Sequence, residues 1–198
     1  MSAQEDTGGA EEALCHQPGH IARWGMVIDV NRCVGCQTCT IACKHANDTP
    51  PGVQWRQVLD VERGSFPDVE RLFMVVGCQH CAEPPCVPVC PTGASYKRPD
   101  NGVVLVDYDK CIGCKYCSWV CPYGALQFDP QKGVMGKCDL CADYIDQGKN
   151  PSCVDACPMR ALDVGDYDAL IEQQQKRLEK EEEQQKESIE FICMDINS

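Results

Sequence analysis

Short apolar runs separated by cysteine-rich loops make up most of this chain. Residues 26–30 read MVIDV, a run of strand length, and residues 103–106 form a similar run after an Asp-Asn-Gly turn. No run approaches the roughly 18 consecutive apolar residues that cross a bilayer, so we expect no direct membrane span. The pattern predicts a helix at residues 38–46 and strands at residues 26–30, 54–62, 72–76, 103–106, 125–128 and 134–137.

The C-terminal part of the chain has a different composition. Residues 166–190 are rich in Glu, Gln and Lys, which favours a helix with little apolar stripe. A solvated surface helix and a docking helix for a partner both fit this pattern. We therefore expect three parts, namely an acidic arm at residues 1–22, a folded region at residues 23–165 and a charged helical tail at residues 166–198.

Net charge and composition restrict the function. The chain has 198 residues and a formal charge of −12, which argues against nucleic acid and against an anionic membrane surface as partners. The acidic N-terminus lacks an apolar stretch, so we expect no export signal of its own. The hydrophobic fraction of 43% includes 18 Cys, and what remains is thin for a core. Metal or disulfides are therefore expected to stabilise the fold.

Sixteen of the cysteines fall into four quartets. The first and third quartets follow C-x2-C-x2-C-x3-C, whereas the second gap holds four residues in the second quartet and eleven in the fourth. The quartets are Cys33, Cys36, Cys39 and Cys43; Cys78, Cys81, Cys86 and Cys90; Cys111, Cys114, Cys117 and Cys121; and Cys138, Cys141, Cys153 and Cys157.

This spacing is typical of bacterial ferredoxins, in which three cysteines bind one [4Fe–4S] cluster and the fourth binds its neighbour. Zinc sites use paired cysteines instead, and a disulfide scaffold needs an oxidising compartment; both are weaker explanations. Two strand–loop–helix units make one ferredoxin-like domain, so four quartets predict an α+β fold of two such domains. Cys15 and Cys193 lie outside the quartets and are expected to be free thiols, and His80 is expected to make a polar contact near a cluster.

Several residues near the quartets are candidates for supporting roles. Gly35 and Gly113 lie inside the cluster loops, where a missing Cβ lets backbone N–H groups approach sulfur. Basic side chains next to cluster cysteines can adjust reduction potentials, although ordinary surface residues explain them equally well. These basic residues are Lys44, Lys110, Lys115, Lys137 and Arg160.

The motifs resemble those of one family. The stretches CVGCQTC at Cys33, GCQHC at Cys78, VDYDKCIGC before Cys114 and KCDLC at Cys138 are similar to the four-cluster iron–sulfur subunits of molybdopterin oxidoreductases of the dimethyl sulfoxide and polysulfide reductase type. The resemblance covers about residues 24–165. Some relatives carry Trp and a [3Fe–4S] cluster where this chain has Cys114. Tyr144 departs from the basic residue expected there.

The resemblance implies how the cysteines share four [4Fe–4S] clusters. It implies an inner unit at about residues 75–128 and an outer unit at residues 24–74 plus 129–165, interleaved along the chain. The implied ligand sets are Cys33, Cys36, Cys39 and Cys157; Cys43, Cys138, Cys141 and Cys153; Cys78, Cys81, Cys86 and Cys121; and Cys90, Cys111, Cys114 and Cys117.

The family also implies a function without substrate chemistry in this chain. The expected role is to pass single electrons between a catalytic subunit with a molybdenum or tungsten pterin and a quinone-reactive membrane subunit. The chain would then be membrane-associated through its partners, on a side that the residues do not identify. A free polyferredoxin, or the electron-transfer subunit of an aldehyde oxidoreductase, formate dehydrogenase or hydrogenase, is the alternative.

Overall fold

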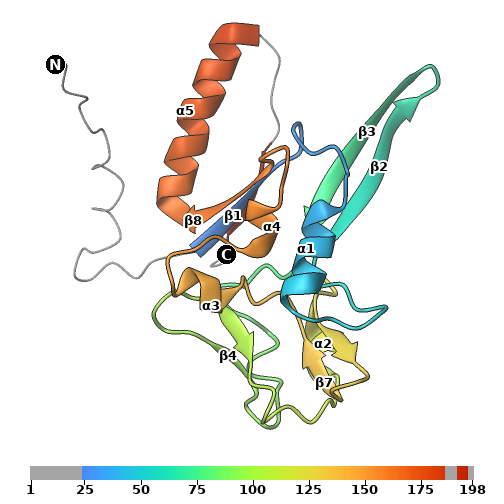
Figure 1. Cartoon of the computed structure of the whole chain (residues 1–198), viewed down its shortest axis with the longest axis vertical. Coiled ribbons are helices and arrows are strands. Elements are labelled where there is room, and N and C mark those ends of the chain that lie inside the picture. The colour runs from blue at the N-terminus through green and yellow to red at the C-terminus, as the bar shows by residue number, and fades with distance from the viewer. Residues whose placement is uncertain (1–23, 186–190, 196–198) are drawn as a thin grey trace, which may run out of the picture.

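The computed structural model describes residues 24–185 and 191–195, with side chains described from residue 24 to residue 179. Most of the strands and helices along the chain are short (Figure 1). The strands are β1 (Trp24–Asp29), β2 (Gln57–Ser65), β3 (Asp68–Val76), β4 (Ser95–Lys97), β5 (Val104–Val106), β6 (Gln127–Asp129), β7 (Val134–Gly136), β8 (Leu162–Asp166) and β9 (Phe191–Asp195). The helices are α1 (Thr38–Ala46), α2 (Tyr116–Val120), α3 (Ala142–Ile145), α4 (Ser152–Asp155) and α5 (Tyr167–Gln185).

The first strand lies in the middle of a sheet with the order β8-β1-β9, and both neighbours are antiparallel to it. Met26, Val27 and Ile28 of β1 are almost fully buried, so apolar burial favours this central position. In the register, Ile28 lies opposite Leu162 on one side and Ile192 on the other. The sheet therefore joins the two ends of the described chain.

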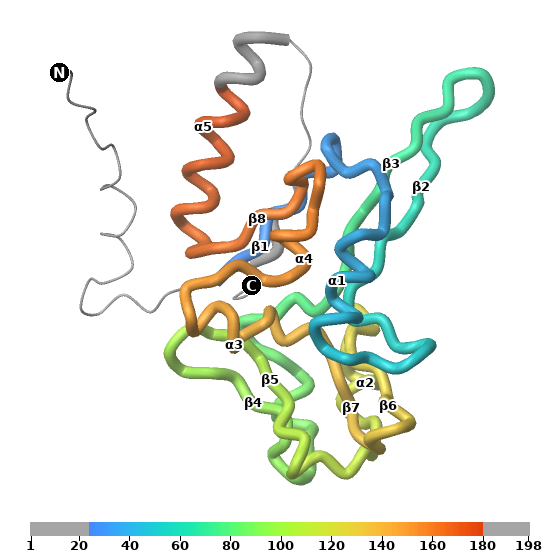
Figure 2. The backbone as a smooth tube through the Cα atoms, in the orientation of Figure 1, coloured from blue at the N-terminus to red at the C-terminus, as the bar shows by residue number. Residues whose placement is uncertain are grey.

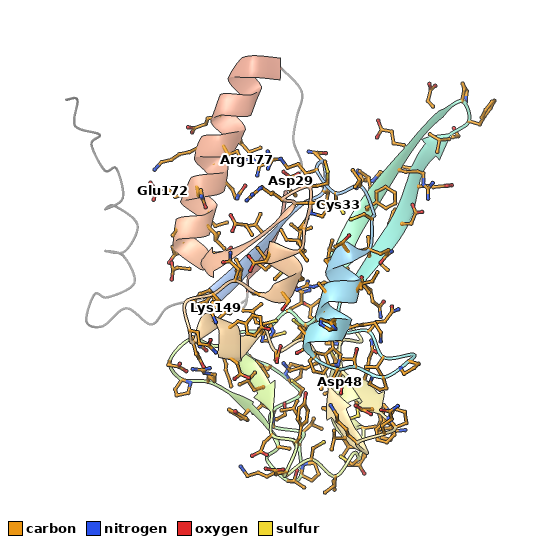
Figure 3. The ribbon with its side chains drawn as sticks, viewed as in Figure 1. Asp29, Cys33, Asp48, Lys149, Glu172 and Arg177 are labelled. Carbon is orange, nitrogen blue, oxygen red and sulfur yellow. The ribbon has the colours of Figure 1, made fainter. Side chains whose placement is uncertain are left out.

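Helix α5 packs beside this sheet. Its first turn is capped by the Asp166 carboxylate, which accepts bonds from the N–H groups of Asp168 and Ala169. Leu170 is buried against Gly165 of β8. Arg177 points from the helix toward Asp29 and the first cluster loop (Figure 3).

Paired strands carry the rest of the fold. The long hairpin β2–β3 projects from the molecule, and most of its side chains are exposed (Figures 1 and 2). The short hairpins β4–β5 and β6–β7 lie at the opposite end (Figure 2). Val103 and Val104 are both buried, but Val103 packs with Ile28 in one core cluster and Val104 packs with Met135 in another. Val103 and Val104, at the start of β5, therefore link the two core clusters.

The predicted elements agree with the structure to different degrees. The helix at residues 38–46 is α1, and each predicted strand overlaps an observed one. The strand expected at residues 54–62 is shifted to β2, because Trp55 and Arg56 turn into the core. The expected C-terminal helix ends at Gln185 and is followed by β9, so the tail is not helical throughout. Within the described residues, no helix has the length and apolar character needed to cross a membrane.

Candidate iron–sulfur sites

The four cysteine loops share one backbone feature. In every quartet, the residue just before the second cysteine has a positive φ, namely 68° at Gly35, 46° at His80, 66° at Gly113 and 60° at Leu140. Residues other than Gly are uncommon in this region, since the Cβ approaches the backbone there. The repeated left-handed residue turns each C-x-x-C segment in the same way, which brings its two sulfurs to one side.

The first and third loops are also entered in the same way. Asp29 and Asp107 each stand four residues before the first cysteine, and each backbone carbonyl accepts a bond from that cysteine's N–H at 3.1 Å. The Asp29 carboxylate accepts hydrogen bonds from the N–H groups of Asn31 and Arg32. The Asp107 carboxylate likewise accepts hydrogen bonds from the N–H groups of Asp109 and Lys110. These Asp-centred turns set the start of both loops.

Gly35 and Gly113 are needed for a second reason. A Cβ on Gly35 would lie 2.5 Å from the ring of Phe73, and a Cβ on Gly113 would lie 2.3 Å from the carbonyl oxygen of Gly133. Each cluster loop therefore packs directly against a hairpin. Close contact with these hairpins, together with positive φ, explains both glycines.

Two small cavities are each surrounded by four cysteines, three from one quartet and one from another. Site 1 is lined by Cys33, Cys36, Cys39 and Cys157. Site 2 is lined by Cys43, Cys138, Cys141 and Cys153. Helices α1 and α4 pack together, which carries the end of the fourth quartet to the first.

The remaining cysteines gather at the other end of the structure. Cys86 and Cys117 are buried in one core cluster, against which Cys111 and Cys121 pack. Burial raises the pKa of Cys81 and of Cys86, and the Cys121 thiol raises both further. The structure thus brings the last cysteine of the third quartet next to the second quartet.

The donor set suits a cluster with several metal atoms. Sites 1 and 2 each offer four sulfurs around a small space; most of the other side chains at site 1 are apolar, whereas Arg56 and Asp139 also line site 2. Among the described residues, no three Cys, His, Asp or Glu side chains converge closely enough to hold a single metal ion. A cube-shaped [4Fe–4S] cluster binds four sulfurs, each through a different iron, which matches the four cysteines around each cavity.

Thiol pKa values differ sharply among the quartets. Burial raises the pKa of Cys43 to about 12, although Arg56 acts in the opposite direction. At Cys90 burial also raises the pKa, but bonds from the Ser95 N–H and from Thr92 outweigh it and lower the value to about 7. Buried thiols such as Cys43 must lose a proton when they bind iron.

His80 and Lys137 bind the backbone N–H and C=O of the same residue, Val104. His80 is fully buried, and its Nδ1 accepts a bond from the N–H of Val104 at 3.0 Å. Lys137 Nζ donates to the carbonyl oxygens of Val104 and Cys138. Burial and the nearby Lys137 charge keep the pKa of His80 well below its usual value, so the ring is neutral. The two side chains tie the second and fourth quartets to β5.

The five basic residues expected beside the clusters have different surroundings. Of the five, Lys137 alone is buried. Lys44 Nζ donates to the carbonyls of Pro50 and Val53, Lys110 pairs with Asp107, and Lys115 lies 4.1 Å from the centre of the Phe128 ring. Arg160 has a φ of 48° at the end of the fourth loop.

Arg56 lies close to these sites, but the sequence motifs do not predict a role for it. Its side chain is only 2% exposed, and its Nη2 lies 3.9 Å from the sulfurs of both Cys138 and Cys153. No nearby motif distinguishes this residue, which follows Trp55 near the start of a predicted strand. Cys15 and the side chain of Cys193 lie outside the described residues, and Tyr144 is exposed on α3.

Comparison with known proteins identifies the family. Residues 69–167 match the family described as a 4Fe-4S dicluster domain. The B subunit of sulfite dehydrogenase from Allochromatium vinosum is 53% identical over 162 residues, covering 71% of this chain and 68% of that protein. The corresponding polypeptide of anaerobic dimethyl sulfoxide reductase from Escherichia coli is 45% identical, covering 75% and 76%. This protein belongs to the iron–sulfur subunits of the dimethyl sulfoxide reductase family.

A third relative of this family agrees. The electron transfer subunit of thiosulfate reductase from Salmonella typhi is 48% identical, covering 72% of this chain and 76% of its own length. The relatives of this chain are thus named as subunits of enzymes with different substrates. The resemblance seen in the cysteine motifs is confirmed.

Proposed function

We propose that this chain is the electron-transfer subunit of a pterin-dependent oxidoreductase and that it holds four [4Fe–4S] clusters. The observation that carries the proposal is the pair of cavities at sites 1 and 2. Each is lined by cysteines that are far apart in the sequence, in the sharing pattern of a two-cluster ferredoxin.

Two further sites complete the set. Site 3 comprises Cys78, Cys81, Cys86 and Cys121, and site 4 comprises Cys90, Cys111, Cys114 and Cys117. The influence of the Cys121 thiol on Cys81 and Cys86 supports site 3. Burial raises the pKa of Cys117 to about 11, and the Cys86, Cys111 and Cys114 thiols raise it further. The influence of Cys111 and Cys114 supports site 4, and that of Cys86 shows that site 3 lies close by.

The two pairs of sites correspond to two interleaved units. Pairing of β1 with β8 and packing of α1 on α4 support an outer unit made from residues 24–74 and 129–165. The hairpin β4–β5 supports an inner unit at about residues 75–128, and the core cluster around Val104 lies in this unit except for Met135 of β7.

The chain's own residues supply ligands, geometry and charge. When bound, a [4Fe–4S] cluster accepts and releases a single electron. A left-handed residue in every cysteine loop, and the Asp-centred turns of the first and third loops, hold the loops in position, and partial burial of the sulfurs limits contact with water. Such pre-positioning means that little of the protein has to move when the charge changes.

The proposed partners follow from the relatives. They are named as components of sulfite dehydrogenase, dimethyl sulfoxide reductase and thiosulfate reductase. We infer a catalytic subunit with a molybdenum or tungsten pterin and a quinone-reactive membrane subunit, through which this chain is held at the membrane. These names give no support to a free polyferredoxin.

Metal analysis of the anaerobically purified complex tests the proposal. A tag on this chain should bring down a large catalytic subunit, about sixteen iron atoms per chain, and molybdenum or tungsten. About eight iron atoms would contradict the four-cluster count. Iron without a second protein would favour a free carrier, and zinc in place of iron would overturn the assignment.

A further inference from the structure

A positive charge lies buried in the lining of site 2 and also acts on Cys39 of site 1. The Arg56 guanidinium is almost completely enclosed, and its Nη2 contacts the Met26 sulfur at 3.1 Å. The same atom lies 3.9 Å from the sulfurs of Cys138 and Cys153, two of the four cysteines of site 2. Its Nε and Nη1 have no hydrogen-bond partner among the described residues.

An isolated charge in such a place is very unfavourable, and buried arginines are normally paired with carboxylates. Among the side chains that the structure describes, no carboxylate binds Arg56; the atoms around its Nη2 are the sulfurs of Met26, Cys138 and Cys153. Arg56 also interacts electrostatically with Cys43 of site 2 and Cys39 of site 1. A guanidinium stays protonated in proteins, and cysteine sulfurs become negative when they bind iron, so the ligand sulfurs supply its counter-charge once the clusters are bound.

The surrounding backbone leaves space for this side chain. A Cβ on Gly77, which directly precedes the second quartet, would lie 3.3 Å from Arg56 Nη1 and 3.1 Å from the Trp55 carbonyl. A Cβ on Gly136 would lie 2.8 Å from the Trp55 ring. Trp55 and Arg56 thus lie against glycines from two other segments, which fixes the guanidinium close to the sulfurs.

We propose that Arg56 is a fixed counter-charge shared by sites 1 and 2 and that it raises the reduction potential of the cluster in site 2 most. The inference rests on the ligand sets proposed above. One-electron reduction changes the net charge of a four-thiolate cluster from about −2 to about −3, with no bond made or broken. A nearby fixed cation stabilises the more negative form, and its effect is strong where water is excluded. The same charge acts on the cluster of site 1 mainly through Cys39.

Redox titration of the intact complex, followed by EPR, tests this role. Arg56→Met removes the charge but keeps an apolar stem, and Arg56→Lys keeps the charge. Arg71→Gln is the matched control, because Arg71 lies on β3 of the hairpin that directly follows Arg56 and pairs with Asp60 at the surface. A Cys141→Ser variant identifies the signal of site 2.

We expect Arg56→Met to shift the midpoint of site 2 to more negative potential and that of site 1 by less, with the other two sites unchanged. Arg56→Lys should stay near the wild type, and Arg71→Gln should shift nothing. Equal midpoints in Arg56→Met and wild type, at full iron content, would overturn the inference. So would iron loss in both Arg56 variants, since the residue would then serve assembly. Low iron in the wild type would instead contradict the proposed clusters.

Discussion

The Arg177 guanidinium on α5 binds the carboxylate of Asp29, which is 3% exposed at the end of β1. Asp29 also forms the turn that leads into the first cysteine loop, through bonds from the N–H groups of Asn31 and Arg32. One carboxylate therefore connects the C-terminal helix with the entrance to site 1.

Removing Arg177 is expected to loosen α5. Arg177→Ala leaves one oxygen of a buried carboxylate without this partner, a loss of about 1–3 kcal/mol. Hydrogen exchange in α5 should become faster by the corresponding factor. Lys176→Ala is the control, because the Lys176–Glu172 pair on the same helix is exposed and should contribute little. Equal exchange in the two variants would show that the ion pair does not hold the helix.

Cysteine variants test how ligands are shared between quartets. Cys121→Ala should perturb the same EPR signal as Cys81→Ala, because both residues are assigned to site 3. Cys114→Ala should remove or convert a different cluster, that of site 4, with a matching loss of iron. Unchanged iron and EPR spectra in Cys114→Ala would contradict its assignment as a ligand.

Two facing glycines offer a matched test of loop packing. Gly113 and Gly133 have φ of 66° and 69°, but only Gly113 would place a Cβ against backbone. Gly133→Ala should cost about 1 kcal/mol of local strain and keep its iron. Gly113→Ala should displace the third loop and lose the cluster of site 4. Full iron content in both variants would show that the loop tolerates the displacement.

Cluster assembly should become more complete as the pH rises. In the cluster-free fold, the Cys43 thiol stays protonated across the neutral range, because burial raises its pKa to about 12. Each such thiol must release a proton when it binds iron, so a higher pH favours binding. Reconstitution with iron and sulfide at about pH 7 and about pH 8.5, scored as iron per chain, measures this. More iron at the lower pH would contradict it.

The sequence predicts the cysteine loops better than what lies between them. Helix α1 follows from the spacing of the first quartet, and the α+β class and family follow from the motifs. Arg56 falls within a predicted strand, and burial of its charge makes sense only once Cys43, Cys138 and Cys153 are known to meet. His80 and Leu140 adopt the conformation expected for Gly, which residue type does not reveal.

Long-range pairing is the other feature that the sequence does not predict. Strand β9 pairs with β1, although almost the whole chain separates them in the sequence. The acidic composition of the residues before β9 suggests only a helix. The register depends on contacts between distant segments, which local patterns do not encode.

The central place of β1 has a consequence for biosynthesis. This strand leaves the ribosome early, but its partner β8 is made roughly ten seconds later at typical rates of synthesis. In the proposed ligand sets, site 1 takes Cys157 and site 2 takes Cys153, both of which follow most of the chain. The cysteines proposed for sites 3 and 4 all lie between residues 78 and 121 and are synthesised earlier. The proposed sets therefore imply that the middle of the chain is ready for iron first and that sites 1 and 2, which join its two ends, are completed last.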